Sequence, residues 1–76
     1  MDIGSRIRQL RIKNGLTMEE LASRSELTKG YISQLENGAA APSISTLEDI
    51  VEALGTNMSF FFKEEPEEVF TFSKED

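Results

Sequence analysis

Residues 16–38 read LTMEELASRSELTKGYISQLENG, and this stretch contains two helix starts in close succession. Thr17 and Thr28 each stand before a run with apolar side chains at helical spacing, which is where a helix N-cap is expected. Glu20 follows Thr17 by three residues, the spacing of a capping box. Because residues 25–27 interrupt the apolar spacing, the stretch predicts a helix, a tight turn and a second helix.

The sequence before this stretch predicts one further helix. Ile3, Ile7 and Leu10 recur at helical spacing with polar residues between them. Asn14 and Gly15 then provide a typical C-terminal stop.

The sequence after this stretch predicts two more helices. A loop of small residues leads to Ser43 or Ser45, either of which is a suitable N-cap. The apolar residues that follow at spacings of three and four are Leu47, Ile50, Val51 and Leu54. Residues 58–62 add a short last turn, in which Phe61 and Phe62 are expected to close the core. We therefore predict an all-α fold, a five-helix bundle.

The composition argues against an enzyme and against a metal or cofactor site. The chain of 76 residues contains neither Cys nor His, so it lacks thiol nucleophiles, imidazole bases and the ligands that zinc prefers. Its paired acids, at residues 19–20 and 64–65, are expected on solvated positions with no nucleophile beside them. No apolar run approaches the ~20 residues of a membrane span, and no secretory signal begins the chain, so a cytoplasmic protein is expected.

The net charge of −6 is unusual for a nucleic-acid-binding protein, but the charge is unevenly distributed. Residues 64–76 contain six acidic residues against Lys74 alone, a net charge of −5, which leaves −1 for residues 1–63. Residues 1–34 contain six basic and four acidic residues and are therefore net +2. The acidity lies mainly in the C-terminal segment, and the first half of the chain is modestly basic.

Residues 3–62 resemble the Cro and repressor type of helix-turn-helix domain, the XRE family. The motifs that carry the likeness are Ile7-Arg8 with Arg11, Gly15-Leu16-Thr17, Glu20-Leu21-Ala22, Leu27-Thr28, YISQLENG at residues 31–38, Pro42-Ser43, Thr46-Leu47 and Ala53-Leu54-Gly55. The resemblance implies a lambda-repressor-like DNA-binding fold in which the second and third helices form the helix-turn-helix. It also implies a transcriptional regulator, here expected to be a repressor that binds double-stranded DNA as a homodimer.

The third helix is the expected reader of DNA sequence, because the second helix of such a pair can enter the ~12 Å wide major groove. Its exposed positions near the N-terminal end are Thr28, Lys29, Gly30, Ser33 and Gln34. Gln34 suits adenine N6 and N7, and Lys29 suits guanine O6 and N7. The alternative is that Lys29 and Gln34 are merely solvated surface.

Phosphate contacts are expected from four residues. The backbone N–H groups at Thr17 and Met18 begin a helix and offer an anion site, where the resemblance also places a phosphate. Phage members of the family often have Gln at the position of Met18; the Met18 side chain cannot bind phosphate, which leaves its backbone amide. Arg8 and Asn37 are further candidates, although Arg6, Arg8 and Lys13 are otherwise expected to form a solvated face.

Two residues are expected to form a structural ion pair. In the family, the positions of Arg11 and Glu36 join the first helix to the end of the reader helix. The alternative role for Arg11 is direct contact with DNA.

Two positions depart from the family pattern. Glu26 stands in the tight turn where Gly is usual, so the turn either holds a strained residue with positive φ or has another geometry. Phe60 replaces a usual polar residue and makes three consecutive phenylalanines, which a one-sided helix cannot all bury. Phe60 is therefore either a dimer contact or a single exposed aromatic.

The chain is expected to divide into a helix-turn-helix domain at residues 1–63 and an acidic segment at residues 64–76. That segment resembles the linker and first strand of regulators that join this domain to a cupin sensor, so a small-molecule effector acting through such a domain stays open. A different class of function, a protein-interaction module such as an antitoxin or coactivator, also stays open because the chain is acidic.

Overall fold

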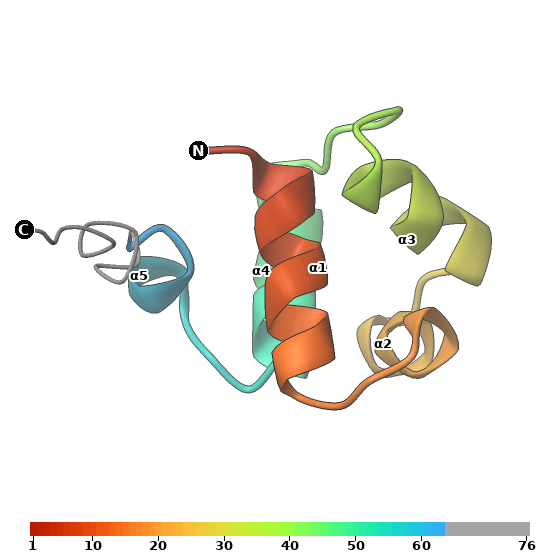
Figure 1. Cartoon of the computed structure of the whole chain (residues 1–76), viewed down its shortest axis with the longest axis horizontal. Helices are drawn as coiled ribbons and strands as arrows, with labels where there is room; N and C mark the ends of the chain where they lie inside the picture. Colours follow the sequence, from red (N-terminus) through yellow and green to blue (C-terminus); the bar gives the residue numbers. More distant parts are fainter. Residues whose placement is uncertain (64–76) are drawn as a thin grey trace, which may run out of the picture.

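The computed structural model describes residues 1–63, and this part of the chain is entirely helical in its regular structure (Figure 1). The five helices are α1 (Ile3–Lys13), α2 (Met18–Ser25), α3 (Lys29–Glu36), α4 (Ile44–Ala53) and α5 (Met58–Phe61). The predicted all-α, five-helix class is thus confirmed. The longest helix, α1, has 11 residues, and none in this part is sufficiently long and apolar to cross a bilayer.

Each helix begins at a polar residue whose side chain accepts a hydrogen bond from a backbone N–H three residues later, which satisfies one of the unpaired donors of the first turn. The five N-caps are Asp2, Thr17, Thr28, Ser43 and Asn57. The capping box is complete, since Glu20 Oε1 also accepts a hydrogen bond from Thr17 N at 2.8 Å. Ser43 rather than Ser45 caps α4.

The helices enclose one apolar core. Helix α3 packs against α1 and α2, α2 also packs against α4, and α4 contacts α5. The buried apolar residues are Ile7, Leu10, Leu16, Leu21, Ala22, Ile32, Leu35, Leu47, Ile50, Val51, Leu54 and Phe61. The pair α2 and α3 lies at one end of the long axis and α5 at the other (Figure 1).

The turn between α2 and α3 keeps a non-glycine residue in the left-handed region. Glu26 has φ 61° and ψ 39°, and its backbone N–H donates to the last carbonyls of α2. This geometry settles the alternatives left open by the sequence: the turn holds a strained residue, because a Cβ is unfavourable at positive φ.

Replacing Glu26 with Gly is expected to raise the free energy of unfolding by up to about 1 kcal/mol, since Gly adopts positive φ without the steric penalty. The gain is smaller than the strain itself because Gly is also more flexible in the unfolded chain. Urea denaturation followed by circular dichroism measures the change. A clear loss of stability in this variant would mean that Glu26 does not adopt positive φ in solution.

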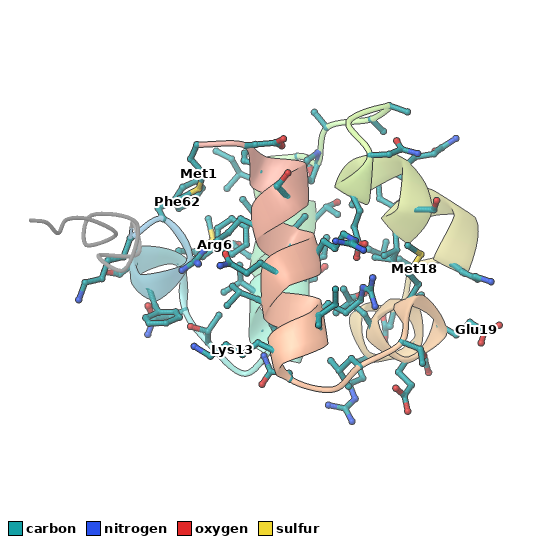
Figure 2. The ribbon with its side chains drawn as sticks, viewed as in Figure 1. Met1, Arg6, Lys13, Met18, Glu19 and Phe62 are labelled. Carbon is teal, nitrogen blue, oxygen red and sulfur yellow. The ribbon has the colours of Figure 1, made fainter. Side chains whose placement is uncertain are left out.

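Two expectations from the sequence are wrong, both near α5. The sequence predicts Arg6 on a solvated face, but Arg6 is only 5% exposed. Its Nε donates to the Phe61 carbonyl oxygen at 2.9 Å and its Nη2 to the Phe60 carbonyl oxygen at 3.1 Å. The last carbonyls of a helix have no partner within it, so Arg6 supplies one from α1 (Figure 2).

The other error concerns Phe62, which is 45% exposed rather than part of the core. Helix α5 has one turn, so it presents only one of the consecutive aromatic side chains to the interior, and that residue is Phe61. The Phe62 ring instead packs edge-on against Phe61, with ring centroids 5.1 Å apart.

Candidate nucleic-acid interface

Helix α3 is held by its inner face and leaves its outer face open. Ile32 and Leu35 are buried in the core, whereas Lys29, Gly30 and Gln34 are exposed. The buried and exposed sets are separated by the helical period, so the exposed residues share one side of α3. A rigid helix with one solvated polar face is the geometry that major-groove reading requires.

An ion pair fixes the C-terminal end of α3 to α1. Arg11 Nε lies 2.6 Å from Glu36 Oε2, and Arg11 Nη2 donates to Glu36 Oε1 at 3.0 Å, so the contact is bidentate. Arg11 Nη1 also donates to the Leu16 carbonyl oxygen at 2.9 Å. Hydrogen bonding to the Glu36 carboxylate raises the pKa of Arg11, so the contact favours the charged guanidinium.

Gly4 allows α1 and α3 to approach each other closely. A Cβ placed on Gly4 would lie 2.2 Å from the Leu35 carbonyl oxygen and 3.0 Å from that of Glu36. The glycine is therefore required by packing at the end of α3 nearest the ion pair. Sequence reasoning missed this role, and the only local signal was a glycine in the first turn of an otherwise regular helix.

The five base-contact candidates differ in exposure and in whether their side chains already make hydrogen bonds within the domain. Lys29 and Gln34 are exposed, and within residues 1–63 no hydrogen bond engages the Gln34 side-chain amide. Thr28 is exposed, but its Oγ1 already accepts from Tyr31 N at 3.1 Å as the N-cap. Ser33 is half-buried.

Gly30 differs from Gly4 because nothing in the described part of the chain requires it to be glycine. A Cβ added at Gly30 would find no atom within 4 Å. Glycine inside a helix costs about 1 kcal/mol relative to Ala. A surface that must be approached closely by a binding partner is one reason to keep a residue without a side chain.

The four phosphate-contact candidates lie around α1, α2 and the end of α3. Arg8 and Thr17 are exposed, although the Thr17 hydroxyl is engaged in the capping box. Met18 is half-buried and packs against the core, with its side chain directed between α2 and α3 (Figure 2). Asn37 is exposed, and its Oδ1 accepts a hydrogen bond from Ala39 N at 3.0 Å.

Phe60 belongs to α5, which lies at the opposite end of the described part of the chain from α3 (Figure 1), and it is 38% exposed. The Arg6 guanidinium carbon is 5.5 Å from the centre of the Phe60 ring, a cation–π distance. Phe60 therefore belongs to the contacts that attach α5 to α1, while a large part of its ring stays accessible.

A short helix, a strained tight turn and a second helix with a solvated polar face define a helix-turn-helix DNA-binding domain. Comparison with protein families gives the same result: residues 7–61 match the Helix-turn-helix family model. The chain belongs to this family, in its XRE or Cro/C1-type branch of transcriptional regulators.

Two relatives show how much of the chain is shared. The chain is 37% identical over 65 residues to the immunity repressor protein of Bacillus phage phi105, covering 86% of this chain and 45% of the repressor. It is 40% identical over 55 residues to the uncharacterized HTH-type transcriptional regulator y4dJ of Sinorhizobium fredii, covering 72% of this chain and 71% of that regulator. The chain thus spans less than half of the phage repressor and most of the smaller regulator.

A solved structure gives a close match to the fold. The restriction-modification controller protein C.Esp1396I superimposes with a TM-score of 0.77 at 33% identity, covering 80% of this chain and 79% of the controller protein.

Proposed function

We propose that this domain binds specific sequences in double-stranded DNA through the outer face of α3 and that it acts as a repressor of transcription. The observation that carries the proposal is the outer face of α3, where Lys29, Gly30 and Gln34 are exposed and no hydrogen bond within residues 1–63 engages the Gln34 amide. The helix is anchored at its C-terminal end by a buried ion pair. The name of the phage phi105 relative, an immunity repressor, supports the sign of regulation.

In this proposal, Gln34 contacts adenine and Lys29 contacts guanine, while Thr28, Gly30 and Ser33 lie against the groove. The backbone N–H groups of Thr17 and Met18 bind a phosphate at the start of α2. Arg8 on α1 and Asn37 at the end of α3 add two further phosphate contacts.

The proposal includes a homodimer on DNA, with Phe60 at the contact between protomers. Within residues 1–63 the exposed aromatic residues are Phe60 on α5 and Phe62 directly after it. Helix α5 lies at one end of the described part and the reading helix at the other (Figure 1). Pairing through α5 therefore leaves both α3 helices free to reach half-sites about one helical turn, ~34 Å, apart. The division into residues 1–63 and 64–76, and the effector domain that the latter would join, are further proposals; residues 64–76 lie outside the described part of the chain.

The acidity of the chain favours one alternative, a protein-interaction module of the same fold. A net charge of −6 opposes DNA approach at long range. We infer no enzymatic activity in either case, because the paired acids Glu19 and Glu20 are exposed and Glu20 serves the capping box.

Salt dependence separates the two functions. Each phosphate neutralised by an Arg or Lys side chain contributes a slope of about −0.9 to log K against log salt. Of the four phosphate-contact candidates only Arg8 is cationic, so the expected slope is about −1 per protomer. Fluorescence anisotropy with labelled duplexes selected from a random pool measures the slope. A slope near zero would support the protein-interaction module instead.

Substitutions on α3 and α1 should affect binding differently. We expect Gln34→Ala and Lys29→Ala each to reduce the free energy of DNA binding by about 1 to 3 kcal/mol through one base pair. Each variant should also discriminate less between bases at that position. Arg8→Ala is the matched control, because loss of a phosphate contact weakens all sequences alike. Binding of each protein variant to a panel of single-base variants of the selected site distinguishes a base-specific loss from a uniform one. Full retention of specificity by Gln34→Ala would show that the reading face is elsewhere.

A further inference from the structure

The chain contains two Asn-Gly pairs in nearly identical backbone geometry. Asn14 and Asn37 both follow the last residue of a helix, with ψ of 5° and 6°. Both are followed by a glycine at positive φ, 70° at Gly15 and 84° at Gly38. Both asparagines are exposed. Backbone conformation and solvent access therefore do not distinguish them.

Hydrogen bonding does distinguish them. Asn14 Nδ2 donates to the Leu10 carbonyl oxygen at 2.7 Å, and the following Gly15 N donates to the Ile12 carbonyl oxygen at 2.9 Å. Within residues 1–63 the Asn37 Nδ2 has no hydrogen-bond partner, and Gly38 N makes only a longer bond of 3.3 Å to the Leu35 carbonyl oxygen. The Asn37 amide is held only through its Oδ1, which accepts from Ala39 N at 3.0 Å. Its leaving nitrogen therefore has no hydrogen bond to break within residues 1–63, and the attacking Gly38 nitrogen is held by a longer bond than Gly15 N.

We propose that Asn37 is a site of spontaneous deamidation, and that its modification weakens the binding of DNA. The assignment of the site rests on the contrast with Asn14. Only the effect on DNA binding rests on the proposed function.

The reaction needs water and a solvent base. The Gly38 backbone nitrogen loses its proton to the base and attacks Asn37 Cγ, forming a new C–N bond that closes a succinimide ring. The bond from Cγ to Nδ2 breaks, and Nδ2 leaves as ammonia after protonation. Water then opens the ring at either carbonyl, giving aspartate or isoaspartate; nothing is oxidised or reduced.

The fold controls how readily the ring closes. Glycine after the asparagine offers no side chain to obstruct the attack, and this holds at both sites. The ψ near zero must change before the nitrogen can reach Cγ, so the reaction proceeds through local opening of the backbone. Opening at Asn14 breaks two short hydrogen bonds made by the reacting groups, whereas opening at Asn37 breaks one long bond and the contact of its Oδ1 with Ala39 N.

The product would place a new negative charge after Glu36, in the loop that follows the reading helix. Asn37 is one of the proposed phosphate contacts, and a carboxylate beside a phosphate is repelled. Isoaspartate would also lengthen the backbone at the end of α3. Both products are therefore expected to weaken DNA binding.

The test follows both sites in one sample. The full chain is incubated in warm, mildly alkaline buffer and digested with trypsin, which places Asn14 on the peptide of residues 14–24 and Asn37 on that of residues 30–63. Tandem mass spectrometry locates the mass gain of the amide-to-acid change. We expect faster modification at Asn37 than at Asn14 in the folded protein and similar rates at both in denaturant. A folded-state rate at Asn14 equal to or above that at Asn37 would overturn the site.

The effect on binding is measured on the same aged samples, each compared with its own unaged protein. The fraction of wild-type protein competent to bind DNA should fall in step with the fraction unmodified at Asn37, whereas Asn37→Gln should keep its own starting value. Unchanged binding by a sample fully modified at Asn37 would overturn the functional part. If unaged protein binds no DNA, the proposed function fails, and the peptide map still decides the modification site.

Discussion

Replacing Arg11 with Ala is expected to lower the free energy of unfolding by about 3 to 5 kcal/mol, the usual loss when one partner of a buried ion pair is removed. The Glu36 side chain is 3% exposed and would keep a carboxylate without its partner. The Leu16 carbonyl oxygen would lose a donor as well. Small domains have only about 5 to 15 kcal/mol of stability in total, so this variant should unfold at much lower urea concentration.

Two further variants distinguish the origin of the loss. Arg11→Lys keeps the positive charge but cannot form the bidentate contact, so it should recover only part of the stability. Replacing Arg11 with Met and Glu36 with Leu together removes both charges from the interior, and it should be more stable than Arg11→Ala. An Arg11→Ala protein with an unchanged melting temperature and no DNA binding would instead make Arg11 a DNA contact.

The helices of this domain are predictable because their signals are local. N-caps, the capping box and apolar residues at spacings of three and four all act within one or two turns. Thr17, Thr28 and Ser43 begin helices in the structure as their sequence contexts predict. Pattern alone could not choose between Ser43 and Ser45, since both are adequate caps.

The contacts that join distant segments are not predictable from local pattern. Arg6 reads as one basic residue among several, and its carbonyl partner Phe61 is 55 residues away. The burial of Phe61 rather than Phe62 depends on where α5 ends, which a run of identical residues does not reveal. The pairing of Arg11 with Glu36 was suggested by family resemblance, and charge spacing could not have supplied it.

The candidate interface was predictable in part. Exposure of Lys29, Gly30 and Gln34 follows from the helical period once Ile32 and Leu35 are placed in the core. Hydrogen bonding modifies that picture, because the Thr28 hydroxyl and the side-chain oxygen Oδ1 of Asn37 each accept a hydrogen bond within the domain. Which hydroxyls and amides remain free depends on atomic positions that a sequence does not specify.

Replacing Gly4 with Ala is expected to produce the other large loss of stability. The added Cβ would lie 2.2 Å from the Leu35 carbonyl oxygen. That oxygen belongs to the backbone of α3 and cannot rotate away, so α1 and α3 must separate. Overpacking of this kind costs about 1 to 3 kcal/mol and occasionally more. It exceeds the gain of up to about 1 kcal/mol in helix propensity when Gly becomes Ala.

Gly30→Ala is the matched control, because it makes the same chemical change on a helix where the new methyl group contacts nothing in residues 1–63. Its stability should be unchanged or higher by up to about 1 kcal/mol, owing to helix propensity alone. Urea denaturation of both variants measures this contrast in stability.

DNA titration of Gly30→Ala tests the proposed interface. Gly30→Ala should bind DNA more weakly despite its stability, because the methyl group would occupy the proposed groove-facing surface. Full DNA affinity of Gly30→Ala would place the groove away from this part of α3. In the denaturation experiment, equal stability of Gly4→Ala and the parent protein would show that α1 and α3 do not approach so closely in solution.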